Sequence, residues 1–220
     1  MPLDIGVDSV EAVSAYGASG AHKLRSSRAK PTLDFMVALI ALFLLMPFLI
    51  LVALLICSES RGPVLFRQKR TGHNGRPFHI YKFRTMCCLE DGESITQASR
   101  DDARITSLGR WLRRTNIDEL PQLLNVLRGE MSLVGPRPHA LAHDHYYSAT
   151  VDRYDERFLA RPGITGLAQV AGLRGPTPTV DDMAARVSQD LEYIRDWSLG
   201  LDFEILARTL MMGPFDPAAF

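Results

Sequence analysis

The stretch FMVALIALFLLMPFLILVALLIC, from Phe35 to Cys57, decides the architecture of this chain because its 23 positions contain no charged residue. As a helix it would reach roughly 34 Å, enough to cross the hydrocarbon core of a bilayer. It starts too late and runs too long for a secretory signal, and SESRGPVLFRQ follows it instead of a small-residue cleavage site. A buried core helix is the alternative, but core helices seldom stay apolar on every face over this length. We therefore predict a membrane segment.

Two features argue against a simple span. Basic residues lie on both flanks, so the positive-inside rule favours the cytoplasmic side for both ends. They are Lys23, Arg25, Arg28 and Lys30 before the segment, and Arg61, Arg67, Lys69 and Arg70 after it. Pro47, near the middle, removes the hydrogen bond that an N–H would donate to the Phe43 carbonyl, and its ring crowds that turn. We predict a monotopic membrane protein with a re-entrant helix broken at Pro47. An ordinary kinked span is the alternative.

The rest of the chain divides into a tail and one domain, because 220 residues suit a single domain with an appendage. Residues 1–30 show no sustained periodicity and are predicted to be a mobile tail. Residues 31–60 would form the re-entrant helix, and residues 61–220 a cytoplasmic catalytic domain with interfacial amphipathic helices. Basic and acidic residues balance at 25 each, which argues against a nucleic-acid binder. The three cysteines form no CxxC motif, which indicates a reducing compartment.

The segment after the membrane helix is strongly basic. Between Arg61 and Arg84 there are seven Lys and Arg residues and no Asp or Glu. The runs VLFRQ and FHIYKF, separated by GHNG, predict a β-hairpin. Beside a membrane segment, such a basic strip suits anionic headgroups or a diphosphate substrate. A solvated basic face is the alternative.

Helical periodicity dominates the remainder. Apolar residues at three- and four-residue spacing predict helices over 105–112, 117–127, 180–194 and 201–212. Thr179 suits the cap of the third helix, and Gly129 is a stop signal for the second. The expected fold is α+β, mostly helical with a small β-hairpin. The sequence contains neither a P-loop nor a GxGxxG motif, so it does not support a Walker or Rossmann nucleotide site.

Residues suited to chemistry concentrate in the middle of the chain. In RRTNIDELPQLLNVLRGEMSLVGPRP, Asp118 and Glu119 follow two arginines and precede a proline. Local sequence favours a purely structural interpretation, with Asn116 as N-cap, Glu119 as its capping-box partner and Asp118 complementing the helix dipole. Arg137 in GPRP and Arg161 in RPGITG lie in rigid loops suited to forked contacts with phosphate oxygens.

A histidine-rich stretch offers a second candidate site. His139, His143 and His145, with Asp144, have a spacing that could ligate a transition metal. No nearby Cys or Glu-x-x-His pattern completes such a site. A polar surface helix is therefore the favoured interpretation.

Several long motifs occur in order over about residues 31–216. They are GPVLFRQKRTGHNGRPFHIYKFRTM, DDARITSLGRWLRRTNIDELPQLLNVLRGEMSLVGPRPHA, RPGITGLAQVAGLRG and DLEYIRDWSLGLDFEIL. Together they resemble the bacterial sugar transferase family, the polyprenyl-phosphate phosphoglycosyl transferases. GPRPHA and DLEYIRDWSL are most similar to the undecaprenyl-phosphate glucose phosphotransferases that start exopolysaccharide synthesis. Met46, Asn116, Leu167 and Ala171 depart from the residues usual in the family, which bears on acceptor or sugar preference.

The resemblance implies an enzyme of the bacterial cytoplasmic membrane with its catalytic domain on the cytoplasmic face. It would transfer a sugar 1-phosphate, with glucose expected, from a UDP-sugar to undecaprenyl phosphate, release UMP and use Mg²⁺. Galactose and N-acetylhexosamine are the alternative sugars, and a non-enzymatic membrane-anchored scaffold is the alternative from another class. No nucleic-acid partner is expected, and self-association as a homo-oligomer is left open.

The resemblance also assigns roles to residues. Asp118 matches the family's nucleophile, which would form a phosphoglycosyl aspartate, and Glu119 matches its partner; both are expected to hold Mg²⁺. An aspartate with a pKa of about 3.9 is ionised at neutral pH, so the obstacle to attack is repulsion from the diphosphate. Nearby cations must offset that charge. The predicted phosphate-binding residues are Lys82, Arg84, Arg113, Arg137 and Arg161.

Overall fold

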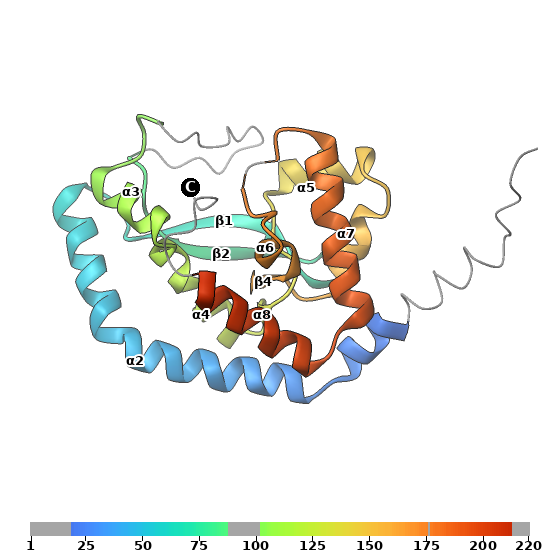
Figure 1. Cartoon of the computed structure of the whole chain (residues 1–220). Helices are drawn as coiled ribbons and strands as arrows, with labels where there is room; N and C mark the ends of the chain where they lie inside the picture. Colours follow the sequence, from blue (N-terminus) through green and yellow to red (C-terminus); the bar gives the residue numbers. More distant parts are fainter. Residues whose placement is uncertain (1–18, 88–101, 176, 213–220) are drawn as a thin grey trace, which may run out of the picture.

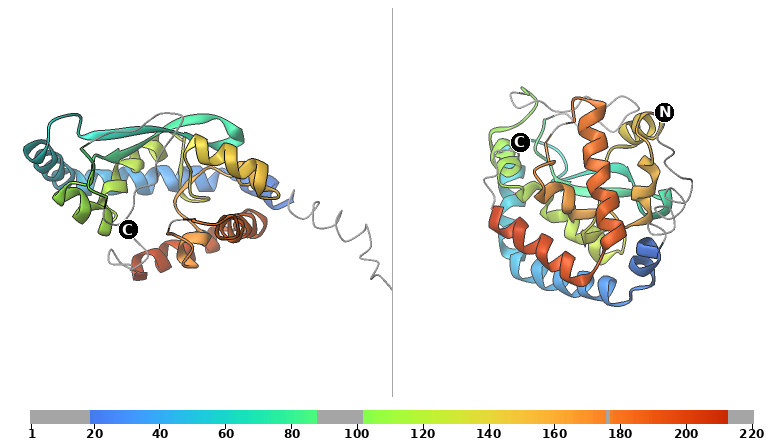
Figure 2. Two further views of the ribbon diagram at one scale, coloured as in Figure 1. Left: turned by 90° about the horizontal axis from the view of Figure 1, so that it is seen from above. Right: turned by 45° about the vertical axis from the view of Figure 1, so that its right-hand side comes forward.

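The computed structural model describes residues 19–87, 102–175 and 177–212. A long helix, α2 (Ala29–Glu59), runs along the lower edge of the body and then up one side (Figure 1). Seen from above, the hairpin of β1 (Leu65–Thr71) and β2 (Pro77–Phe83) lies on the opposite side of the body from α8 (Leu199–Met212) (Figure 2). The remaining elements are η1 (His73–Gly75), α3 (Ser107–Arg114), η2 (Ile117–Gln122), α4 (Leu123–Leu127), β3 (Ser132–Val134), α5 (Leu141–Thr150), η3 (Tyr154–Leu159), β4 (Gly163–Thr165), α6 (Leu167–Val170) and α7 (Val180–Asp196).

Between Phe35 and Cys57, helix α2 is apolar on all sides, but only one stripe of it contacts the rest of the protein. Ala38, Leu42 and Ile56 belong to this stripe and are buried in the main hydrophobic core. The other faces expose large apolar side chains, with Phe43 78% and Leu44 69% accessible. Among the described residues, α2 is the one helix long and apolar enough to cross a membrane. This surface indicates membrane association.

Pro47 lies inside α2, and the helix continues through it to Glu59. Figure 1 shows that α2 bends, so its later part climbs the side of the body. A proline removes one hydrogen bond and crowds the preceding turn, which permits a bend without ending the helix. The predicted break is therefore a bend within one continuous helix. Re-entrant insertion and monotopic topology stay predictions.

The N-terminal boundary differs from the predicted tail over residues 1–30. Residues 19–26 are helical, and Ala21 and Leu24 are buried in the main core. Gly20 lies so close to α7 that a Cβ atom there would come within 2.2 Å of the Arg195 carbonyl oxygen. The later part of the predicted tail is thus packed structure, while residues 1–18 lie outside the described residues.

The predicted β-hairpin is confirmed, with β1 and β2 antiparallel around the turn His73–Gly75. Helix α4 docks on β2 through the buried side chain of Asn125. Its Oδ1 accepts a hydrogen bond from the Tyr81 N–H at 3.0 Å, and its Nδ2 donates to the His79 carbonyl at 2.7 Å. This amide therefore forms hydrogen bonds with two backbone groups of β2 and holds the hairpin against α4.

The predicted helices are confirmed at α3, α7 and α8. Thr179 caps α7 in a capping box with Asp182. The segment 117–127, predicted as one helix, is instead the 3₁₀ helix η2 followed by α4. Pro121 lies inside η2 and has no N–H to donate to the preceding turn, which explains why a regular α-helix does not start at Ile117.

The sequence analysis did not predict a second sheet, in which β3 and β4 pair in parallel. With three residues each, these strands are too short to show an alternating pattern. Their pairing brings the loops GPRP and RPGITG together: the Gly135 N–H donates to the Thr165 carbonyl, and the Gly163 N–H to the Pro136 carbonyl, both at 2.9 Å. A Cβ atom on Gly163 would lie 2.1 Å from the Gly135 nitrogen, so only glycine fits there.

Candidate active site

The turn that carries Asp118 and Glu119 is not the helix cap that local sequence favours. Asn116 adopts the left-handed conformation, with φ of 57°, and its side chain makes no capping hydrogen bond. Its Oδ1 instead accepts a hydrogen bond from Arg174 at 2.5 Å. The Glu119 carboxylate bonds to other side chains, so the capping-box interpretation is wrong. The tight turn lays η2 against β2 and places both carboxylates beside the hairpin.

Glu119 is buried and held by two cations. Its Oε1 accepts hydrogen bonds from Lys82 Nζ at 2.7 Å and from Arg137 Nη2 at 2.6 Å, and its Oε2 accepts one from Arg137 Nη1 at 3.0 Å. Burial acts to raise the pKa of Glu119, but Arg137 and Lys82 hold it well below the usual value. Glu119 is therefore an ionised, fixed carboxylate that draws Lys82 of β2 and Arg137 of the GPRP loop to one point.

Asp118 has the opposite environment, although it directly precedes Glu119. It is 8% exposed, and within the described part of the chain no side chain or backbone group forms a hydrogen bond or ion pair with its carboxylate. Burial, followed by the charge of Glu119, raises the pKa of Asp118 to about 6, against the lowering influence of Lys82 and Arg113. A desolvated carboxylate with unoccupied oxygens near several cations is suited to attack an electrophile.

Arg113, at the end of α3, supplies a third cation near Asp118. Its Nε donates a hydrogen bond to Thr85 Oγ1 at 2.9 Å, which orients the guanidinium. Burial lowers the pKa of Arg113, and Asp118 is the charge that most opposes this shift. The structure thus brings together three of the five predicted phosphate-binding residues: Lys82, Arg113 and Arg137.

The other two predicted phosphate-binding residues lie elsewhere. Arg84 donates to the backbone carbonyls of Pro63 and Ser60, both at 2.6 Å, so it holds the chain that leaves the C-terminal end of α2. The side chain of Arg161 lies near His73, whose pKa is lowered by burial and then by this arginine. His73 is at the hairpin turn, at the other end of β2 from Lys82. Neither residue has a contact that supports phosphate binding beside Asp118.

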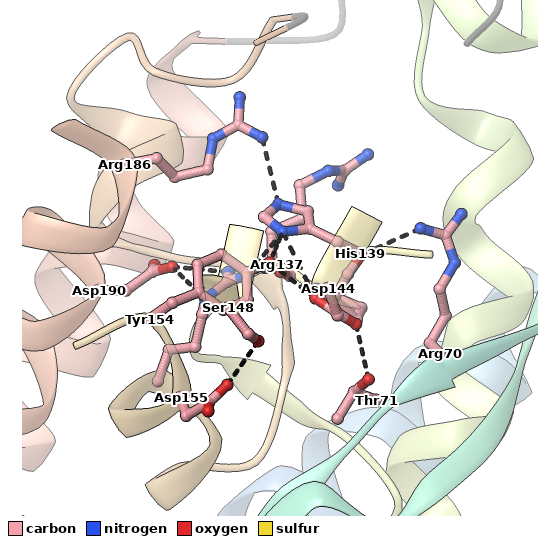
Figure 3. A network of polar contacts seen from close by, with 12 residues as sticks. Arg70, Thr71, Arg137, His139, Asp144, Ser148, Tyr154, Asp155, Arg186 and Asp190 are labelled. Carbon is pink, nitrogen blue, oxygen red and sulfur yellow. Dashed lines mark hydrogen bonds and ion pairs between the residues drawn. The ribbon is translucent and has the colours of Figure 1, made fainter. Parts of the chain in front are cut away.

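A buried polar network lies behind the GPRP loop, and the sequence analysis did not identify most of it (Figure 3). Arg157 forms an ion pair with Asp190 at 2.7 Å, and Tyr154 donates a hydrogen bond to Asp144 at 2.7 Å. His139 contacts both Arg157 and Tyr154. These residues come from η3, α5, α7 and the loop before α5, so no local motif could have grouped them.

The structure tests the predicted histidine-rich helix only in part. The helix exists as α5, which begins two residues after His139, but His139 and Asp144 are buried instead of lying on a polar surface. Over the described ranges, no three His, Cys, Asp or Glu side chains form a group that could hold a metal ion. The predicted polar surface is therefore wrong at His139 and Asp144, and the absence of a transition-metal site stays a prediction.

A family comparison identifies the protein class. The model of the family described as bacterial sugar transferase matches residues 25–214. The chain belongs to this family. A related sugar transferase from Caulobacter vibrioides, named UDP-glucose:undecaprenyl-phosphate glucose-1-phosphate transferase, is 52% identical over 95% of this chain and 78% of its own length.

Two other related sugar transferases are longer. A protein of Escherichia coli with the same name is 46% identical over 85% of this chain and 40% of its own length. A more distant relative from Aeromonas hydrophila, named UDP-N-acetylgalactosamine-undecaprenyl-phosphate N-acetylgalactosaminephosphotransferase, is 40% identical over 82% of this chain and 42% of its own length. This sugar transferase chain therefore spans less than half the length of these two relatives.

The dyad of this sugar transferase can be tested for its fit to Mg²⁺. Magnesium in phosphate-transfer sites is usually bound by one or two carboxylates together with substrate phosphates and water. In the part of the chain that the structure describes, the carboxylate oxygens of Asp118 have no protein partner, whereas both oxygens of Glu119 are occupied by Lys82 and Arg137. The donor set fits an ion held by Asp118 and a diphosphate. Glu119 could join only by giving up part of its contacts with the two cations.

Proposed function

We propose that this protein transfers glucose 1-phosphate from UDP-glucose to undecaprenyl phosphate and releases UMP, as the first step of exopolysaccharide or other glycoconjugate assembly. The observation that carries the proposal is the division between two adjacent buried carboxylates: Glu119 is held by Lys82 and Arg137, whereas Asp118 has no ion-pair partner among the described residues. The names of the Caulobacter and Escherichia relatives support the donor and the acceptor.

Asp118 acts as the nucleophile in the first half of the reaction. An oxygen of its carboxylate attacks the sugar-bearing phosphorus, the bond from that phosphorus to the bridging oxygen breaks, and UMP leaves with the electron pair. Arg113 and the Lys82–Arg137 pair reduce the repulsion between the carboxylate and the diphosphate. Bound Mg²⁺, held by Asp118 and the phosphates, would add charge neutralisation. The product is a phosphoglycosyl aspartate.

The lipid acceptor then uses the same site from the membrane side. Undecaprenyl phosphate attacks the phosphoglycosyl aspartate and regenerates the Asp118 carboxylate. Glu119 keeps Lys82 and Arg137 in place through both halves, so the positive charge remains fixed while one phosphate leaves and another arrives. Two successive half-reactions allow a water-soluble donor and a membrane-embedded acceptor to share one nucleophile.

We further propose that the protein lies in the bacterial cytoplasmic membrane, with α2 re-entrant and the catalytic domain on the cytoplasmic face. The exposed apolar faces of α2 support insertion. Basic residues on both flanks of α2 support the placement of both ends on the cytoplasmic side.

UMP release from a panel of UDP-sugars, measured with purified full-length protein and undecaprenyl phosphate, tests the proposal. We expect the highest kcat/KM with UDP-glucose. A higher value with UDP-galactose or a UDP-N-acetylhexosamine would assign a different sugar, and the Aeromonas relative makes the latter a specific alternative. No UMP release from any of them would favour a membrane-anchored scaffold.

A further inference from the structure

Arg186 of α7 is a buried cation that forms no ion pair with any carboxylate of the described residues. It is 6% exposed, its Nε donates to the Leu173 carbonyl at 3.0 Å, and its Nη2 donates to the Gly175 carbonyl at 2.6 Å. Throughout residues 19–87, 102–175 and 177–212, no carboxylate lies within ion-pair distance of it. Buried charges in proteins are normally paired, so this guanidinium indicates a missing negative group.

The ring of His139 shows where that group would lie. Arg157 Nη1 is 2.6 Å from His139 Nδ1, and because arginine is always a donor, Nδ1 must accept. The proton of the neutral ring is therefore on Nε2. That Nε2–H faces Arg186 Nη1 at 3.3 Å, so two donors meet and neither can satisfy the other. An acceptor beside both nitrogens would resolve the conflict.

Two observations support a neutral ring and an excess of positive charge here. Burial, followed by Arg157 and Arg186, holds the pKa of His139 well below its usual value. Burial, followed by Arg137 and Arg157, lowers the pKa of Arg186 to about 10, and the charge of Asp190 only partly opposes this shift. Figure 3 shows Arg186 and Arg137 on either side of the outer edge of the His139 ring. An oxyanion at this edge would relieve the repulsion among these cations.

We propose that His139 Nε2–H and Arg186 Nη1, next to Arg137, form a phosphate subsite for the UMP part of the donor. The assignment rests on the proposed function. Arg137 is bonded to Glu119, the neighbour of the nucleophile, so the sugar-bearing phosphorus lies on one side of Arg137 and the second phosphate extends to the other. When the bond to the bridging oxygen breaks, the electron pair stays on UMP. The two donors stabilise the charge that develops there.

The test compares the binding of UMP with that of uridine, which differs by the phosphate, to the full-length protein in detergent by calorimetry. Wild-type protein should bind UMP about ten- to a hundredfold more tightly than uridine, as expected for charge-assisted hydrogen bonds. His139→Gln keeps an N–H donor near the Nε2 position and should retain most of this ratio. His139→Phe and Arg186→Lys should each reduce it about tenfold or more while uridine binding stays the same.

Controls separate this subsite from folding, from the acceptor and from the proposed reaction. Arg153→Gln removes an exposed arginine of the same region and should leave the ratio unchanged. Each variant is first checked for an unaltered thermal melting curve, and Arg186→Lys and His139→Phe provide independent variants. An unchanged UMP-to-uridine ratio in both, or weaker binding of a short polyprenyl phosphate in place of UMP, would overturn the assignment. A wild-type protein that prefers UMP to uridine but releases no UMP from UDP-sugars would contradict the proposed function and leave the subsite standing.

Discussion

At the scale of single residues, Asp118 and Glu119 differ in their partners more than in their chemistry. We expect Asp118→Asn to abolish UMP release, by at least about a thousandfold, because the amide keeps the size of the side chain and loses the attacking charge. The melting temperature should not fall. Asp181→Asn is the matched control, since Asp181 is an exposed acidic residue in the first turn of α7. Wild-type turnover in Asp118→Asn would show that Asp118 has only a structural role.

The raised pKa of Asp118 gives a prediction for pH dependence. Attack requires the carboxylate, so kcat/KM for UDP-glucose should rise with pH and level off above about 6. Stability should change in the opposite direction, because the folded state binds more protons at this group than the unfolded chain between about pH 4 and 6. The contribution of protonated Asp118 is fully present at low pH and is lost as pH rises through that window.

Denaturant unfolding checks the sign of this effect. Asp118→Asn should be more stable than wild type at pH 8, and its advantage should disappear as the pH falls towards 4. A variant whose relative stability instead grows as the pH falls would show that Asp118 is favourably paired in the folded protein. Far-UV circular dichroism at both pH values would confirm that the comparison concerns the same folded state.

Whether a site residue could be predicted depended on whether local structure or tertiary contacts set the direction of its side chain. Sequence identified the dyad and Lys82, Arg113 and Arg137, which the structure gathers at one place. Arg84 was predicted to bind phosphate together with Lys82. Strand β2 ends at Phe83, however, and Arg84 bonds to carbonyls beyond α2. The direction of a side chain past a strand end depends on tertiary contacts that no local pattern contains.

At the scale of elements, the N-terminal end of α2 is joined to the domain by buried charges. Lys30 Nζ donates to Asp202 of α8 at 2.8 Å and to the Val134 carbonyl at 3.1 Å, and Asp34 accepts from Ser132 Oγ at 2.6 Å. Tyr193 donates to Asp202 at 2.8 Å. The cluster fixes α2 to the strand that precedes the GPRP loop.

We expect Lys30→Met to destabilise the protein by about 3–5 kcal/mol, because it leaves the buried carboxylate of Asp202 without its cation. Lys23→Met removes an exposed lysine of the preceding helix and should have little effect. Thermal unfolding in detergent measures both. The double variant Lys30→Met/Asp202→Asn should recover part of the loss, and failure of any recovery would show that the ion pair is not its cause.

The elements also show the limit of periodicity as a signal. The positions of helices α7 and α8 were predicted correctly because apolar residues recur at three- and four-residue spacing over several turns of each. The strands β3 and β4 were not, because three residues hold less than two periods of alternation. The two strands pair with each other but lie about thirty residues apart in sequence, so only the folded chain reveals that the two arginine-containing loops meet.

At the scale of the whole molecule, many of the exposed large apolar side chains lie on α2 and α8. Phe203, Leu210 and Met211 of α8 are exposed by 61%, 82% and 85%, and the Lys30–Asp202 ion pair holds α8 beside α2. Figure 2 shows the two helices along one border of the molecule. Large apolar side chains this exposed are a feature of surfaces that bind other molecules or membranes, so we expect both helices to contact lipid.

A labelling experiment can decide whether α2 is re-entrant or spans the membrane. Single cysteines in place of the exposed Arg28 and Arg61, in a background with the native cysteines replaced by serine, would be labelled with an impermeant maleimide. For a re-entrant helix both sites should react only in inverted vesicles, because both ends of α2 lie on the cytoplasmic side. Pro47→Ala should straighten α2 towards a continuous helix, long enough to cross a bilayer core of about 30 Å. Mixed labelling is therefore expected for that variant alone, and labelling of Arg28 and Arg61 sites from opposite sides in the parent protein would establish a span.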